Sequence, residues 1–406
     1  MTTLTNAPTL AELSEAIISE QARAAGEPAW MVERRIAAWQ GYAAAEPPFW
    51  RRTDLTKLDL TAPIAPSSAQ NTQIIGDAAL AAQGVIFMPL AQALIEHPAL
   101  VEQYFGKAVA SDTHKYRLLH SALWQDGAFL YIPKNIVIEA PLRAIVRLAD
   151  GTNGIFPHTI IALDRGASVS FIQEYRSADV AGQALVGAAT EIFLSDDAQL
   201  RFIALQALGA GVYQIDAQRA IVGRGAKVEW TALNLGAKLQ HLECETSLDG
   251  NGSQVDWTAA TLARAGQVLL SAPWLRHNGA NTEGHMNFKS VVKDDGYTTF
   301  DGMIKIDHNS RGTVSRLEEH ALHLSPKARS DSIPGLMIDT NDVAKAGHAS
   351  TSGQVDEDIL FYMRSRGITR ADAVHMIVMG FFEPVFDRIP LAELREEVAT
   401  LVEGKI

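Results

Sequence analysis

A short phrase recurs four times in the middle of the chain. Each copy has a turn residue, a small residue and then alternating apolar and polar residues that close on an aromatic ring. The closing rings, separated by 31, 28 and 27 residues, are Phe171, Phe202, Trp230 and Trp257. A near-fixed period of this length is typical of stacked units, each of which buries its inward side chains only against its neighbours. The repeat predicts a parallel β-helix.

Two other all-β folds also contain short alternating strands. A β-sandwich or immunoglobulin-like array shows turn signals without this longer repeat, and a propeller blade needs roughly 40–50 residues per unit. The repeat drifts after Trp257, but the segments 297–300 and 312–315 have the composition of further rungs. The pattern therefore favours the β-helix while leaving both alternatives open.

Helical periodicity replaces the strand pattern at both ends of the chain. Thr9 and Glu12 have the spacing of a capping box, and apolar residues then recur at helical spacing to about Ala24; a second helix starts near Pro28. Near the other end, Thr369 and Asp372 form a similar box. We expect a mainly helical region over residues 1–120, a β-helix over 121–362 and a helical region over 363–406.

The C-terminal helices each carry one apolar face. The first face contains Met376 and Gly380, and the second ends at Leu401. Such faces either pack on the solenoid or dock a partner. The residues that we single out for docking are Ala373, Ile377, Phe381, Leu391, Leu394 and Val398.

Composition narrows the classes of function. The net charge of −12 gives no attraction to nucleic acid or to anionic lipid. The longest apolar stretches, such as Met376–Phe382, are far shorter than the roughly 20 residues that span a bilayer, and Met1–Thr9 has no secretory pattern. We therefore expect a cytoplasmic protein that binds neither nucleic acid nor membrane.

Cysteine occurs once, at Cys244. An intramolecular disulfide is therefore impossible, and a cysteine-rich zinc or iron–sulfur site cannot be built from this chain alone. We expect Cys244 to be a buried, inert residue, because unpaired cysteine commonly behaves as a small core hydrophobe.

The histidines do not form an obvious metal site. His320 and His323 have the spacing of two ligands on a helix, but the segment 319–324 has the composition of a strand, where these positions point to opposite faces. His277, His285 and His308 are isolated among polar residues, and we expect them to be solvated.

Sequence motifs give little support to an enzyme. The serine-hydrolase elbow, the zincin motif and the phosphate-binding loop are all absent from the sequence. A β-helix could be a polysaccharide lyase, for which candidate groups exist, namely Asp294, Asp295, Asp301 and Asp307 near Lys289, Lys293 and Lys305. An acidic chain has surface carboxylates in any case. We assign no catalytic residue, and we keep a lyase or an unrelated interaction solenoid as the alternative.

Two C-terminal segments carry a family resemblance. Residues 342–351 contain Asp342, Val343 and His348, and residues 353–368 read G-Q-V-D-E-D-I-L-F-Y-M-R-S-R-G-I. Together they resemble the C-terminal signature of the SufB/SufD family of the SUF iron–sulfur cluster assembly system, in which D-V-x-x-x-H precedes L-F-Y-x-x-S-R-G-I. The segments 131–135, 322–328 and 51–55 extend the resemblance over nearly the whole chain.

The resemblance implies a fold and a set of partners. The implied fold is a right-handed parallel β-helix between two helical regions, as the pattern also predicts. The implied protein is a non-catalytic subunit that pairs with a SufB-like paralogue through the end of the β-helix and with a SufC-like ABC ATPase through its C-terminal helices. The missing scaffold cysteines favour the SufD branch, whose members could form homodimers when isolated.

The same resemblance assigns a role to His348. It implies that the imidazole ligates iron at the SufB interface, in a cluster that the two chains share transiently and that the isolated chain does not hold. The interval from Val343 to His348 is one residue longer than the motif spacing. We therefore expect a β-bulge that re-aims the imidazole.

Overall fold

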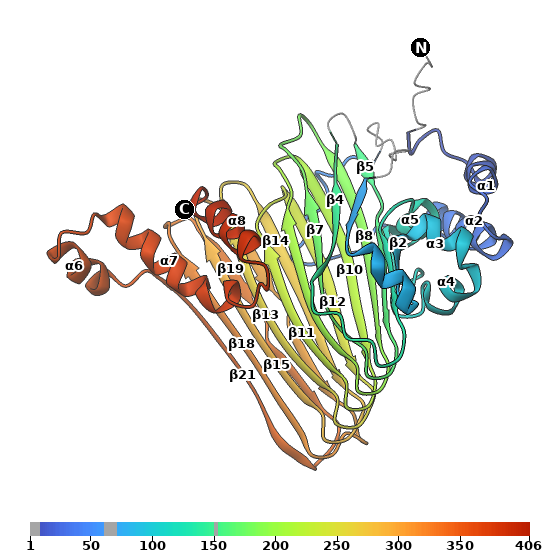
Figure 1. Cartoon of the computed structure of the whole chain (residues 1–406). Coiled ribbons are helices and arrows are strands. Elements are labelled where there is room, and N and C mark those ends of the chain that lie inside the picture. The colour runs from blue at the N-terminus through green and yellow to red at the C-terminus, as the bar shows by residue number, and fades with distance from the viewer. Residues whose placement is uncertain (1–8, 61–70, 150–152) are drawn as a thin grey trace.

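The computed structural model describes residues 9–60, 71–149 and 153–406, and two facing β-sheets dominate it (Figure 1). No secretory pattern was found in the sequence of Met1–Thr9; of this segment, only Thr9 is among the described residues. The first sheet has nine strands in the order β1 (Thr72–Ile75), β4 (Leu142–Arg147), β7 (Ser168–Arg176), β9 (Gln199–Ala207), β11 (Lys227–Asn234), β13 (Gln254–Ala263), β15 (Glu283–Val292), β18 (Thr313–His323) and β21 (Val343–Gln354).

The second sheet has twelve strands. Its main path is β19 (Arg329–Ser332), β16 (Tyr297–Phe300), β14 (Val268–His277), β12 (Leu239–Leu248), β10 (Val212–Val222), β8 (Ala184–Leu194), β6 (His158–Leu163), β3 (Ala128–Ile132) and β2 (Ile86–Pro89). Alongside this path lie β5 (Gly154–Ile155), β17 (Met303–Ile306) and β20 (Gly335–Ile338).

The chain alternates between the two sheets, and the strands of each coil pair in parallel with those of the next. This topology is the predicted parallel β-helix. A β-sandwich or a propeller would pair neighbouring strands antiparallel, so neither alternative describes the molecule.

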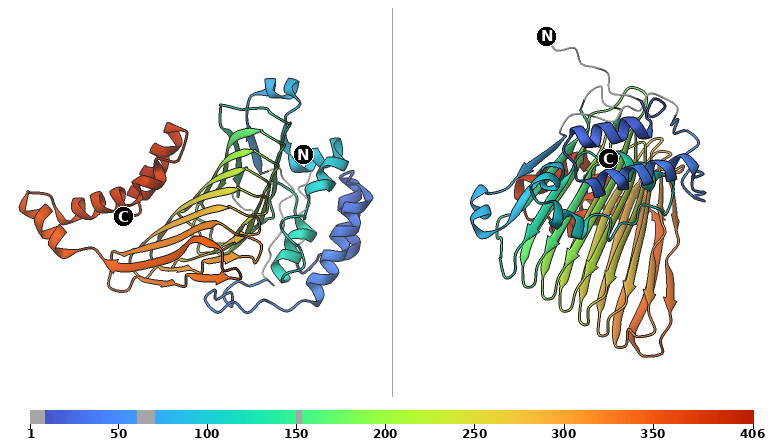
Figure 2. Two further views of the ribbon diagram at one scale, coloured as in Figure 1. Left: turned by 90° about the horizontal axis from the view of Figure 1, so that it is seen from below. Right: turned by 90° about the vertical axis from the view of Figure 1, so that its right-hand side faces the viewer.

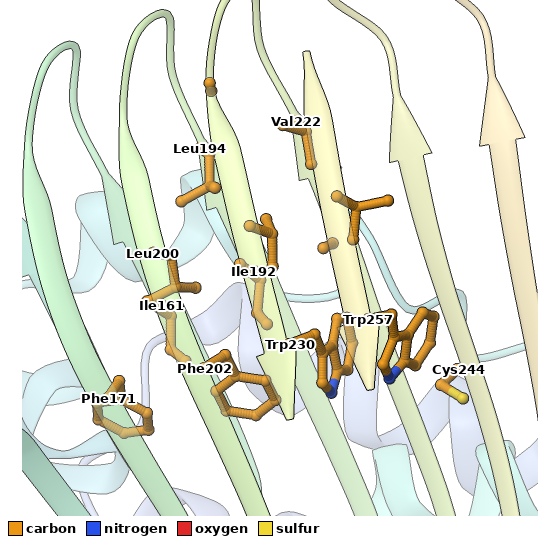
Figure 3. Close-up of a cluster of buried hydrophobic side chains, with 14 of the residues drawn as sticks. Ile161, Phe171, Ile192, Leu194, Leu200, Phe202, Val222, Trp230, Cys244 and Trp257 are labelled. Atoms are coloured by element: carbon orange, nitrogen blue, oxygen red, sulfur yellow. The ribbon is translucent and has the colours of Figure 1, made fainter. Parts of the chain in front are cut away.

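The recurring aromatics form one ladder inside the solenoid (Figure 3). Phe171, Phe202, Trp230 and Trp257 are register partners on β7, β9, β11 and β13, and all are buried. The rings of Trp230 and Trp257 stack with their centroids 4.4 Å apart. Because each ring covers its neighbour, the repeat buries a continuous apolar column that no single coil could bury alone.

The turn residue of the repeat has a defined backbone conformation. Gly166, Gly225 and Gly252 have φ angles of 70°, 65° and 70°, and Asp197 takes the same left-handed conformation with φ 61°. Glycine suits this position because it has no Cβ, and aspartate is among the few other residues that tolerate it.

Substitution of Gly252 by alanine isolates this backbone requirement. A Cβ built on Gly252 meets no atom within 4 Å, so the Gly252→Ala variant should lose only conformational energy, about 1 kcal/mol of unfolding free energy. Gly380, which is helical and equally unobstructed, is the control: the Gly380→Ala variant should be stabilised by up to about 1 kcal/mol. Urea denaturation measures both changes, and equal effects would refute the left-handed turn as a determinant of stability.

Helices cover the outer face of the twelve-stranded sheet. They are α1 (Glu15–Ala24), α2 (Ala29–Ala44), α3 (Leu90–Glu96), α4 (Pro98–Tyr104) and α5 (Lys115–Leu123). The 3₁₀-helix η1 (Ala78–Gln83) lies between β1 and β2, buries no residue and packs Leu80 on the interior core instead. The N-terminal cluster shares one apolar core with Tyr213 and Ile215 of β10. The Thr9–Glu12 hydrogen bonds form, but they close a turn; α1 begins at Glu15 because Ser14 is its N-cap.

The C-terminal helices are α6 (Glu357–Ser365), α7 (Arg370–Phe386) and α8 (Ala392–Glu403). Thr369 caps α7 through a hydrogen bond from the Asp372 backbone N–H, as the sequence predicted. The helices α7 and α8 bury apolar side chains against the outer face of the nine-stranded sheet, on the side of the strands opposite the N-terminal helices (Figure 2, left). In the parts of the chain that the structure describes, no helix is long and apolar enough to cross a bilayer.

Candidate functional site at the open edge of the solenoid

The two ends of the solenoid differ. At the N-terminal end β1 pairs antiparallel with β4, and β2 pairs antiparallel with β3, so these strands cover the first coil. At the other end β21, β19 and β20 are the last strands, and no further strand among the described residues pairs with their outer sides. We call these three strands the open edge. Unpaired backbone N–H and C=O groups along such an edge are a template for another chain.

His348 lies on β21 at the end of the interior ladder. The register continues from Trp257 through Met286 and Leu317 to His348, so the imidazole occupies the inward position of the last rung. No strand covers it, and His348 is exposed although its column is buried further inside. Among the described residues, none is hydrogen bonded to its imidazole, which leaves both ring nitrogens available.

A bulge places His348 on this inward face. The register of β18 and β21 shifts between Thr313 and Val314, which leaves Ala344 as the extra residue of β21. Val343 packs on the interior core, and His348 shares a register pair with buried Leu317, although His348 lies an odd number of positions, five, after Val343. Because side chains alternate along a strand, only an inserted residue allows both to face inward. The predicted bulge is confirmed.

The neighbours of His348 line the mouth of the solenoid with mixed chemistry. Ser350, the next inward residue, donates a hydrogen bond to Glu319, with 3.0 Å between the oxygens. Burial raises the pKa of Glu319. Across the mouth, Leu336 packs on the interior core and Ile338, two residues further along β20, is 44% exposed. The open edge thus offers an imidazole, a buried carboxyl group and uncovered apolar surface.

The other histidines do not join this site. His320 and His323 point to opposite faces of β18, as predicted, where they bond to Thr351 and Ser330 respectively. The prediction that His277 is solvated is wrong. It is fully buried, its ring nitrogens lie 2.8 and 2.9 Å from the hydroxyls of Thr282 and Ser315, and burial lowers its pKa to about 3.

His285 and His308 are at least partly exposed and pair with Glu283 and Asp307. In the described part of the chain, no three or more histidine, cysteine, aspartate and glutamate side chains form a group that could hold a metal ion.

Cys244 is buried inside the solenoid, as expected (Figure 3). It belongs to the interior core, and burial raises the pKa of its thiol well above the ordinary value. A thiol held neutral is a poor nucleophile and a poor metal ligand.

The lysines proposed for a polysaccharide lyase site have other partners. Lys289 donates to the backbone carbonyl of Phe381 at 2.8 Å, and Lys293 bonds to the backbone carbonyl of Ile406. Both lysines therefore bond to the C-terminal segment, and Lys305 pairs with Asp339, which is not one of the candidate aspartates.

The predicted docking residues need a correction. Leu394 and Val398 are buried in the core that α7 and α8 share with the nine-stranded sheet. Ala373 is buried outside this core, and Ile377, Phe381 and Leu391 are partly covered. An apolar stripe on a helix predicts that this face is covered by something. Most of the apolar faces of α7 and α8 are covered by the chain's own nine-stranded sheet. The exposed apolar residues of the C-terminal helices are Ile359, Phe361, Tyr362 and Met376.

Three of these exposed residues belong to α6, which extends away from the strands at the far left of Figure 1. Leu360 is its one buried residue, and Glu357 ties it to α7 through an ion pair with Arg370 at 2.7 Å. The four consecutive apolar residues from Ile359 to Tyr362 spread around the helix. A helix that is apolar on all sides normally packs against more than one partner surface. This pattern was the signal in the sequence that α6 has an apolar face left uncovered by the described residues.

The architecture defines a class: a parallel β-solenoid covered at one end, open at the other, with a projecting helical arm. Comparison with known proteins then assigns the family. The SUF system FeS cluster assembly SufBD core domain matches residues 146–381, and the SufBD N-terminal region matches residues 68–144. The chain belongs to the SufBD family of the SUF iron–sulfur cluster assembly system.

Individual relatives agree with this assignment. The chain is 34% identical to the iron–sulfur cluster assembly protein SufD of Bacillus subtilis, over 80% of this chain and 74% of that protein. It is 29% identical to a SufBD family protein of Staphylococcus saprophyticus, over 97% of this chain and 94% of that protein. The family match confirms the resemblance noted in the sequence.

Proposed function

We propose that this protein is the non-catalytic partner without an accessible cysteine in a cytoplasmic assembly complex and that it completes an iron pocket at its open edge. The observation that supports the proposal is the position of His348: an exposed imidazole at the inward end of the interior ladder, on the last strand of the solenoid. A SufB-like paralogue with an open edge of its own would place its thiolates opposite this imidazole.

The chemistry of the edge fits iron as cargo. A neutral imidazole nitrogen ligates iron readily, and mixed histidine and cysteine ligation occurs in iron–sulfur centres. This chain contributes the nitrogen but no accessible thiolate, since Cys244 is buried. The cluster would then be shared at the seam and would leave with neither chain alone.

The same edge would hold the two chains together. Backbone groups of β21 are free to pair with a partner strand, and Ile338 and Met337, each 44% exposed, would be covered at the seam. Two copies of this chain could meet through the same edge when the paralogue is absent. Co-expression with a SufB-like paralogue and a SufC-like ATPase tests the pairing: copurification of all three supports it, and a homodimer that excludes both partners would contradict it.

The arm formed by α6 would dock a SufC-like ABC ATPase. Its exposed apolar residues lie on a helix that follows β21 and extends away from the strands, so the ATPase could bind the arm while the paralogue pairs with the strand edge (Figure 1). Closure of two ATPase subunits upon ATP would pull on the arms of the two scaffold chains and strain the seam between them.

A charge on this arm should weaken ATPase binding. Phe361 is 72% exposed, so the Phe361→Asp variant should fold normally, yet it should lose at least tenfold in affinity for the SufC-like ATPase, about 1.4 kcal/mol. Phe49, 92% exposed in the segment between α2 and β1, provides the matched control as Phe49→Asp. Binding of immobilised ATPase measures both variants. Equal affinity for both would place the docking surface elsewhere.

A further inference from the structure

A polar layer lies inside the solenoid, above the apolar ladder. Gln214, Asp216 and Gln218 alternate along β10 with Tyr213 and Ile215, which pack outward against the N-terminal helices. The three polar side chains therefore face the interior, and they are 0%, 2% and 5% exposed. A carboxylate in such a place carries a large desolvation penalty unless something compensates its charge.

The hydrogen bonds of this layer are unbalanced. Every amide nitrogen has an acceptor: Gln214 and Gln218 donate to Asp216 Oδ2 at 3.3 and 2.8 Å, Gln240 donates to Asn234 at 3.0 Å, and Gln206 donates to the carbonyl of Gly236 at 3.0 Å. Four buried oxygens, however, accept no hydrogen bond from any residue that the structure describes, namely Gln206 Oε1, Gln214 Oε1, Gln240 Oε1 and Asp216 Oδ1.

Rotating the amides does not remove the imbalance. Exchanging the nitrogen and oxygen of Gln214 or Gln240 would point an oxygen at the oxygen that now accepts from it. The surplus acceptors are also neighbours: Gln214 is the register partner of Gln240, Gln240 bonds to Asn234, and Asn234 is the register partner of Gln206. One cluster therefore presents several unpaired acceptor oxygens, which either a cation or a hydrogen-bond donor such as water would satisfy.

The charge of the layer selects the ligand. Asp216 supplies one negative charge, and the amide oxygens are neutral. Among the described residues, Arg35 is the one buried lysine or arginine, and it pairs with Glu27 in the N-terminal region. A single positive charge balances the layer, whereas a divalent ion would leave one charge uncompensated in the interior. Carboxylate and amide oxygens are the hard ligands that alkali and alkaline-earth cations take.

We propose that this interior layer binds one monovalent alkali cation through Asp216 Oδ1 and the amide oxygens of Gln206, Gln214 and Gln240. The ion bridges the two sheets at the level of β9 to β12, where the N-terminal helices cover the solenoid. Its role is structural and independent of the cluster chemistry proposed for the open edge.

Rubidium is the probe for this site. In crystals of the full chain grown with rubidium chloride, an anomalous peak should lie between the sheets within coordinating distance of Asp216. In solution, the thermal midpoint of the full chain should be about 2 °C or more higher in potassium or rubidium chloride than in tetramethylammonium chloride at equal ionic strength. Tetramethylammonium is too large for an interior site.

Two aspartate variants make the test specific. The Asp216→Asn variant keeps the shape but removes the charge, so the salt-dependent shift should vanish. The Asp301→Asn variant, at an exposed carboxylate, should keep it. If Asp216→Asn does not fold, the anomalous map of the unmodified protein still decides. An interior without an anomalous peak, together with equal midpoints in all three salts, would mean that water alone fills the layer and would overturn the proposal.

Discussion

The His348→Ala variant should assemble with its partners but should carry about tenfold less iron and acid-labile sulfide than the unmodified complex. The imidazole is exposed and no described residue bonds to it, so its removal leaves no orphaned group and no cavity in the chain. The loss should therefore fall on the metal, because removing a ligand or its support typically weakens metal binding by one to two orders of magnitude.

Anaerobic purification of the co-expressed complex, followed by iron and sulfide analysis, measures this effect. The His308→Ala variant is the matched control, since the His308 side chain is 71% exposed and lies on the turn between β17 and β18, outside the three strands of the open edge. Unchanged iron and sulfide in the His348→Ala complex would exclude the ligand role while leaving the pairing of the chains intact.

The Ile338→Asp variant should separate this protein from its SufB-like paralogue. Ile338 extends the inward column of Ile306 on the last strand of its sheet, and its exposed part would be covered only in the complex. A carboxylate buried there without a partner should cost at least about 2 kcal/mol of binding free energy, roughly 30-fold in Kd.

Native mass spectrometry of the co-expressed chains distinguishes the two surfaces. The Ile338→Asp variant should lose the paralogue and keep the ATPase, and the Phe361→Asp variant should do the reverse. The thermal midpoint of each isolated variant serves as the folding control. Retention of the paralogue by Ile338→Asp would show that the open edge is not the seam.

The stacked part of the fold was the most predictable from the sequence. Each coil repeats the same physical problem, so the aromatic ladder from Phe171 to Trp257 and the left-handed turn residues recur visibly. The bulge before His348 was predicted from the family motif, whose interval this sequence exceeds by one residue between Val343 and His348. Because side chains alternate along a strand, a bulge accommodates the extra residue.

Burial of a side chain by parts of the chain that are distant in sequence could not be predicted. His277 is flanked by Arg276 and Asn278, and these polar neighbours suggest that its side chain is exposed to solvent. The side chain nevertheless faces the buried interior of the solenoid, where β14 is paired on both sides with strands of the neighbouring coils. Leu394 and Val398 show the converse. Their stripe predicts a covered face, but it does not tell whether the cover is the chain's own sheet or a partner.

The interior polar layer is the feature that was hardest to predict from the sequence. Gln214, Asp216 and Gln218 alternate with apolar residues, which in an isolated sheet would mark them as the solvent side. The N-terminal helices reverse this assignment, because they cover the other face of β10. Only the tertiary arrangement reveals that the polar face is the interior one.

Hyperfine spectroscopy of the reduced complex tests the central claim most directly. When the assembled complex is labelled with ¹⁵N-histidine, the cluster should show coupling to one imidazole nitrogen, and the coupling should disappear in the His348→Ala variant. A cluster without any nitrogen coupling, held by thiolates alone, would contradict the proposal that this chain supplies the imidazole of a shared iron pocket.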